Sequence, residues 1–185
     1  MPENTSSKHT VVALVENQPG VLMRVTNLFR RRNFNIDSLS VGRTHRENVS
    51  RMTIVVDSAR ANPQKIMANL LKLVPVIDVA NVGSDLHVSR DLALVKVRSD
   101  DAESRNALTT IVERYPARIV DIGPKYAIVE ITAQEDRVAQ CIEELEPIGI
   151  VEMVRTGVVA MGRGTRILDS SYERAAQPAT NGYHV

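Results

Sequence analysis

The turn Asn17-Gln18-Pro19-Gly20 is the one local group of residues with a plain chemical use. It follows a run of β-branched residues and leads directly into a helical pattern, whose free N–H groups and dipole favour an anion such as a carboxylate. Gly20 has no Cβ, so a carboxylate can approach the backbone, and the Asn17 amide oxygen can accept a hydrogen bond from an ammonium group. With small aliphatic residues nearby, the turn fits a free aliphatic amino acid, although it also fits an ordinary tight turn that binds nothing.

Other sequence patterns that support catalysis or metal binding are absent. No glycine-rich nucleotide loop, His-Glu-x-x-His pair or Cys-x-x-Cys pair occurs. Ser84 and Asp85 stand close to His87, but in a linker, and we interpret this as chance adjacency. A surface or loop position is expected for each of the four scattered histidines, His9, His45, His87 and His184.

The single cysteine, Cys141, excludes an intramolecular disulfide and a cysteine-based metal site, and it fits a reducing compartment. Its helical spacing from Val138 and Leu145 predicts a small core residue. The N-terminus has no apolar signal region, and no stretch approaches the roughly 18 apolar residues of a membrane span. We therefore expect a cytoplasmic protein without a membrane partner.

Charge and aromatic content argue against nucleic-acid binding. The formal net charge is +1, whereas a general nucleic-acid binder carries a strong basic excess. Aromatic residues make up 3% of the chain, and the predicted central strands carry none on which bases could stack. The charge is split, with 10 Lys and Arg against 6 Asp and Glu in residues 9–88, but 10 against 13 in residues 89–165. This difference indicates two distinct units.

The elements that position these residues recur in two similar sets. In the first, strands are predicted over 9–15, 35–41, 49–57 and 76–82, with a helix from Val21 to a C-cap at Asn33 and another from Asn62-Pro63 to Val74. In the second, strands are predicted over 91–97, 118–122, 126–131 and 151–161. Its helices follow two capping boxes, formed by the pairs Asp100 with Glu103 and Thr132 with Glu135.

Both sets have the order β-α-β-β-α-β. The predicted fold is therefore α+β, with two ferredoxin-like βαββαβ units in tandem at residues 9–83 and 90–165. Residues 166–185 lose apolar density and are expected to form a flexible tail. This fold serves many functions, so it does not by itself indicate one.

The stretch LVENQPGVLMRVTNLFRRRNFNIDSLSVGRTH, followed by SRMTIVVD, closely resembles the ACT domain of the small regulatory subunit of acetolactate (acetohydroxyacid) synthase. The segments DLALVKVRS, RIVDIGPKYAIVEITA and IVEMVRTGVVAMGRG resemble the second domain of the same subunit. One departure is Asn33, where the family often has Gly. Because Asn tolerates the same backbone conformation, we expect the site to be unchanged.

The resemblance implies a non-catalytic chain that activates a catalytic large subunit and confers feedback inhibition by valine, and often by leucine or isoleucine. Thiamine diphosphate, Mg²⁺ and FAD are then expected in the catalytic partner, and no cofactor, metal ligand or catalytic residue in this chain. The resemblance also implies a homodimer through the ACT domain, with the effector at its interface. By motif, one chain would contribute Asn17, Gly20, Val21 and Leu22, and its neighbour Asn35 and Ile36.

Two alternatives remain open at this stage. One is a stand-alone ACT protein that senses an amino acid and controls another enzyme or a regulator. The other is a small enzyme that uses the second unit, for which Asp121, Tyr126 and Glu130 are the polar candidates. Polar residues at strand ends are usually structural, which weighs against this second alternative.

Overall fold

The structure, a computed structural model, describes residues 8–57, 62–82, 87–164 and 168. Contacts divide the chain into two compact units, which we call unit 1 (residues 1–87 and 161–185) and unit 2 (residues 88–160). Ser84, Asp85, His184 and, apart from Leu168, the predicted tail over 166–185 lie outside the described residues. None of the helices in the described ranges is long and apolar enough to cross a membrane.

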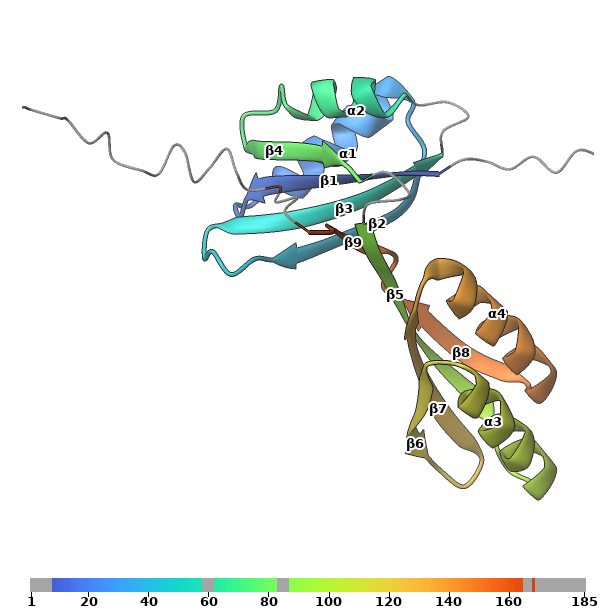
Figure 1. The fold of residues 1–185 in the computed structure, drawn as a ribbon. Coiled ribbons are helices and arrows are strands. Elements are labelled where there is room, and N and C mark those ends of the chain that lie inside the picture. Colours follow the sequence, from blue (N-terminus) through green and yellow to red (C-terminus); the bar gives the residue numbers. More distant parts are fainter. Residues whose placement is uncertain (1–7, 58–61, 83–86, 165–167, 169–185) are drawn as a thin grey trace, which may run out of the picture. The chain divides into compact units, whose positions relative to one another are not determined.

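Unit 1 is a four-stranded antiparallel sheet with its two helices on one face (Figure 1). The strand order is β2-β3-β1-β4, as expected for a ferredoxin-like unit. Its elements are β1 (Lys8–Glu16), α1 (Val21–Arg32), β2 (Ile36–Arg43), β3 (Val49–Asp57), α2 (Pro63–Leu70) and β4 (Val76–Asn81).

The core of unit 1 forms where alternate strand residues meet the apolar stripes of the two helices. Val11, Ala13 and Val15 of β1 pack with Val25 and Phe29 of α1, and all five are buried. This alternation assigns each residue of β1 to one face of the sheet: odd-numbered residues face the helices, and even-numbered residues face away from them.

The caps of unit 1 follow the sequence closely. Asn33 ends α1 in the left-handed conformation, with φ 55°, and Phe34 then packs edge-on against Phe29 with ring centroids 5.9 Å apart. The Asn62 side chain accepts a hydrogen bond from the Gln64 N–H at 2.9 Å. The predicted extension of α2 to Val74 is wrong, since the helix ends at Leu70.

Unit 2 repeats this plan, with the strand order β6-β7-β5-β8 and β9 paired to β5. Cys141 is fully buried in its core, as predicted. Its elements are β5 (His87–Arg98), α3 (Ala102–Arg114), β6 (Ala117–Ile122), β7 (Tyr126–Ala133), α4 (Glu135–Leu145), the 3₁₀ helix η1 (Glu146–Ile148), β8 (Ile150–Arg155) and β9 (Val159–Gly162).

Three sequence predictions in this half need correction. The strand expected over 151–161 is two strands, because the chain leaves the extended conformation at Gly157, with φ 75°. The cap of α3 is Asp101 instead of Asp100, and its carboxylate accepts the Ser104 N–H at 2.6 Å. Thr132 caps no helix, since it lies within β7 and α4 begins after Gln134.

Candidate functional site

The loop between β1 and α1 leads directly into a helix start that carries no side-chain cap. Gly20 is the N-cap of α1, with φ 84° and ψ −7°, and no side chain caps the helix there. A Cβ added at Gly20 would meet no atom of the chain within 4 Å, so the approach to the backbone is open. Asn17 is exposed, Val21 is buried, and Leu22 is 45% exposed beside the loop. Asn17, Gly20, Val21 and Leu22 lie together at this loop because they are near neighbours in the sequence.

Backbone hydrogen bonds hold this loop in place. The Asn17 N–H donates to the Asn48 carbonyl at 2.8 Å, which joins the loop to the hairpin between β2 and β3. The Glu16 N–H donates to the Pro75 carbonyl at 2.8 Å, just before β4. A ligand would therefore meet a preorganised turn, which lowers the entropic cost of binding.

Asn35 and Ile36 lie at the opposite end of the sheet from this loop. Ile36 pairs with Val56, which pairs with His9 near the start of β1, whereas the loop follows Glu16 at the end of β1. Glu16 follows His9 by seven steps along the extended strand, which is about 23 Å. Within one chain, Asn35 and Ile36 are therefore not brought together with the other four predicted residues.

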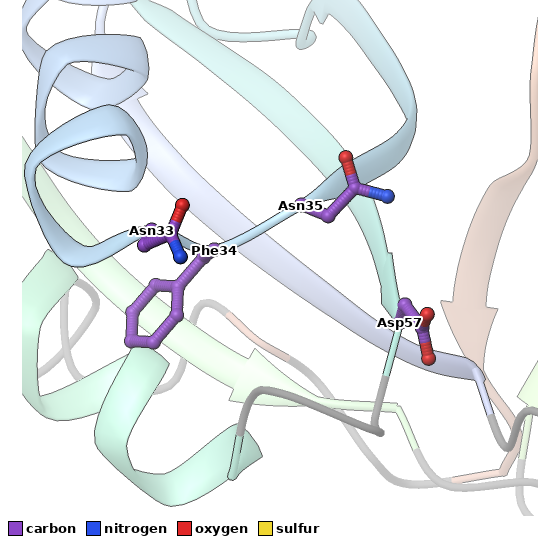
Figure 2. Close-up of a pocket in the computed structure, with 4 residues that line it drawn as sticks. All are labelled: Asn33, Phe34, Asn35 and Asp57. Carbon is purple, nitrogen blue, oxygen red and sulfur yellow. The ribbon is translucent and has the colours of Figure 1, made fainter.

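A hollow of about 410 Å³ lies at the Asn35 end of the sheet, lined by Asn33, Phe34, Asn35 and Asp57. Figure 2 shows these four residues, and in this view the amide groups of Asn33 and Asn35 and the carboxylate of Asp57 stand apart from one another. Phe34 packs against the unit 1 core. Amide oxygens and a carboxylate suit an ammonium group. Asn33 and Asp57 were not among the predicted site residues. Asn33 was interpreted only as the C-cap of a helix, and only the pairing of β2 with β3 places Asp57 beside Asn35.

Among the polar candidates for catalysis in unit 2, Glu130 has an ion-pair partner. Glu130 is held by Arg118, whose terminal nitrogen lies 2.9 Å from the carboxylate. Asp121 pairs with Ile128, which stands between Tyr126 and Glu130 along β7. In the described ranges, no group of three or more His, Cys, Asp or Glu side chains could hold a metal ion.

The shifted pKa values that we find have structural causes. The backbone N–H of Ser104 lowers the pKa of Asp101, as expected for a helix cap. The hydrogen bond to Glu144 raises the pKa of Tyr115, and burial raises that of Cys141 to about 11. These residues stabilise helix ends and the core of unit 2, so their shifts do not indicate acid–base catalysis.

Comparison with known proteins gives consistent matches along both units. A family model for the ACT domain of acetohydroxyacid synthase small subunits (AHAS small subunit-like) matches residues 12–78, and one described as the small subunit of acetolactate synthase matches residues 90–164. The probable acetolactate synthase small subunit of Archaeoglobus fulgidus is 43% identical over 159 residues, which cover 86% of this chain and 99% of that protein.

Two further matches agree with these. The acetolactate synthase small subunit of Mycolicibacterium smegmatis is 42% identical over 163 residues, which cover 88% of this chain and 95% of the relative. Among solved structures, the acetolactate synthase small subunit of Thermotoga maritima superposes with a TM-score of 0.80 at 36% identity, over 86% of this chain and 99% of that one.

Proposed function

The chain belongs to the family of acetolactate synthase small subunits, and we propose that it activates a catalytic large subunit and makes it sensitive to feedback inhibition by valine. The observation that carries this proposal is the match of both units, in order, to the two domains of the same kind of subunit. Leucine and isoleucine are the other candidate effectors, since they carry the same charged groups on similar aliphatic side chains. We assign thiamine diphosphate, Mg²⁺ and FAD to the catalytic subunit and no cofactor to this chain.

The proposed effector site needs two copies of the chain. Strand β2 is an edge of the unit 1 sheet, and two such edges can pair in antiparallel fashion around a twofold axis. Antiparallel pairing sets the Ile36 end of one β2 beside the Arg43 end of the other. In each copy, the Arg43 end of β2 lies at the same end of the sheet as the loop from β1 to α1. Helix α1 then crosses over β3 and leads back to the Ile36 end of β2. This arrangement supports a site between one chain's loop and its neighbour's Asn35 and Ile36.

The residues of such a site match the groups of a free aliphatic amino acid. The uncapped start of α1 at Gly20 suits the carboxylate, and the hollow with Asn35 and Asp57 of the neighbouring copy suits the ammonium group. The exposed side of Leu22 suits an aliphatic side chain. An effector bound there inhibits only if it prefers one state of the complex, so inhibition reflects its difference in affinity between two states.

We expect the purified chain to form no acetolactate from pyruvate, and to raise the rate of the matching catalytic subunit when the two are mixed. The reason is that the chemistry resides in the large subunit, while this chain changes its conformational equilibrium. The measurement is a colorimetric acetolactate assay of each chain alone and of the mixture, with heat-denatured chain as the control. Acetolactate formation by this chain alone would contradict the proposal.

Valine should raise the melting temperature of the chain. At a concentration 100 times its Kd, a ligand that binds only the folded protein adds about 2.7 kcal/mol of apparent stability. Differential scanning fluorimetry with L-valine measures this, and D-valine is the matched control because it has the same charges and size. An unchanged melting curve with L-valine, L-leucine and L-isoleucine would exclude the amino-acid site, and binding without activation would instead favour a stand-alone sensor.

A further inference from the structure

The sheet of unit 1 carries both of its helices on one face, and we call the opposite face the outer face (Figure 1). Val12 and Leu14 of β1 project to the outer face, because the odd-numbered residues of β1 project to the helices. They are 0% and 4% exposed, and Thr53, which pairs with Val12, is 3% exposed. A sheet face without helices is commonly solvated, so residues outside the sheet must cover this one.

A hollow of about 890 Å³ lies over the outer face. Val12 and Leu14 line it together with Ala80 of β4, which pairs with Val12, and all of its lining residues belong to unit 1. Met161 and Leu168, from the last part of the chain, also line it. Leu168 belongs to the predicted flexible tail, yet its side chain is only partly exposed. The hollow is therefore formed between the outer face and the C-terminal part of the described chain.

Charged side chains that line the hollow restrict what can complete this cover. Arg43 of β2 and Arg51 of β3 bring two positive charges, and Asp78 of β4 brings one negative charge. Arg51 and Asp78 lie on the outer face, because they pair with Leu14 from its two sides. The excess of positive charge favours a segment in which acidic residues stand next to apolar ones, since opposite charges attract more strongly where water is partly excluded.

The sequence directly after Leu168 has this chemistry. Asp169 follows it at once, and Tyr172 and Glu173 come four residues after Leu168 and Asp169. A spacing of four residues places two side chains on one face of a helix. In a helical turn, Tyr172 would therefore share a face with Leu168, and Glu173 would share a face with Asp169. The segment lies beyond residue 164, where the match to the family model ends.

We propose that residues 169–173 dock in this hollow on their own chain. Tyr172 then covers the apolar floor, and Asp169 and Glu173 lie toward the arginines. Because Leu168 already lines the hollow, the segment starts at its site, and a short tether gives it an effective concentration on the order of millimolar there. The docked segment joins the end of the chain to the hairpin between β2 and β3, which also holds the loop between β1 and α1.

A single tryptophan tests this docking in the full-length protein. The chain contains no tryptophan, so Tyr172→Trp introduces a unique fluorophore. An indole that leaves water emits at a shorter wavelength and is quenched less by acrylamide. We expect both effects for Tyr172→Trp, and both should be lost when the protein is unfolded in urea. Tyr183→Trp is the matched control, since it lies outside the proposed segment and should emit as an indole in water does.

Two further changes, each made in the Tyr172→Trp protein, locate the docking site. Ala80→Glu sets a carboxylate in the hollow and should return the emission to the longer wavelength, because it opposes both the apolar contact and the acidic residues of the segment. Ala80 lies on an edge strand and is partly exposed, so the sheet should tolerate the change. The double change Asp169→Lys with Glu173→Lys should have the same effect without altering the sheet.

Four results would overturn the proposal. Emission of Tyr172→Trp as in water would show that the segment does not dock. An equal shift for Tyr183→Trp would remove the assignment to residues 169–173. A shift that survives both Ala80→Glu and the double lysine change would place the indole outside the hollow. A shift that disappears on dilution of the protein would assign the occupant to the segment of a second copy.

Discussion

Gly20→Asp should abolish inhibition by valine while activation of the catalytic subunit is retained. The added carboxylate would stand at the start of α1, where the effector carboxylate is proposed to bind. Two like charges about 4 Å apart near a protein surface repel by about 4 kcal/mol. Even a loss of about 2.7 kcal/mol raises the valine concentration for half inhibition about 100-fold. The measurement is a valine titration of the reconstituted pair at a saturating amount of this chain.

The fold should tolerate this substitution. The new Cβ meets no atom within 4 Å, and a negative charge near a helix N-terminus is favourable. The remaining cost is the left-handed conformation at φ 84°, which Asp and Asn adopt more readily than other residues with a side chain. We expect this cost to be about 1 kcal/mol.

Gly20→Asn is the matched control, because Asn has the size and the backbone tolerance of Asp without the charge. If repulsion is the cause, Gly20→Asn should keep much of its valine sensitivity, while Gly20→Asp loses it. Equal loss in both variants would point to steric exclusion of the carboxylate. A folded Gly20→Asp protein that activates normally and shows unchanged valine inhibition would place the effector site elsewhere.

The sequence predicts best what depends on neighbouring residues. The left-handed Asn33, the cap at Asn62 and the turn at Gly20 each follow from local backbone chemistry, and all three are confirmed. The end of α2 before Val74 could also have been predicted from neighbouring residues. Val74 continues the helical spacing, but it precedes Pro75, and a residue before proline is disfavoured in a helix.

Features that depend on distant residues escape this reasoning. The break between β8 and β9 depends on Thr156, whose backbone and hydroxyl bond to Leu92, 64 residues away in the chain. The hollow beside Asn35 depends on Asp57, which only the pairing of β2 with β3 brings there. Asp100 and Asp101 are adjacent carboxylates of equal capping chemistry, and the structure places Asp101 at the cap, where it accepts the Ser104 N–H.

Arg155→Ala should be among the most destabilising single substitutions in unit 2. The Asp91 side chain is 1% exposed, and one of its carboxylate oxygens accepts from the Arg155 Nε at 2.8 Å and from a terminal nitrogen of the same guanidinium. Removal of one member of a buried pair leaves an uncompensated charge, which costs about 3–5 kcal/mol. Because the Arg155 side chain is 31% exposed, we expect a value near 3 kcal/mol. Hydrogen exchange of the β5 and β7 amides measures this loss in unit 2 separately from unit 1.

A second ion pair across the same two strands provides the control. Lys96 of β5 lies 3.0 Å from Glu152 of β8, and their side chains are 36% and 72% exposed. Since exposed pairs contribute about 1 kcal/mol or less, Lys96→Ala should change the stability little. A double variant, Asp91→Leu with Arg155→Met, should recover most of the loss, because apolar side chains of similar volume remove both buried charges together. If Arg155→Ala costs no more than Lys96→Ala, the Asp91 carboxylate must reach water once the guanidinium is gone, and the ion pair then contributes little to the stability of unit 2.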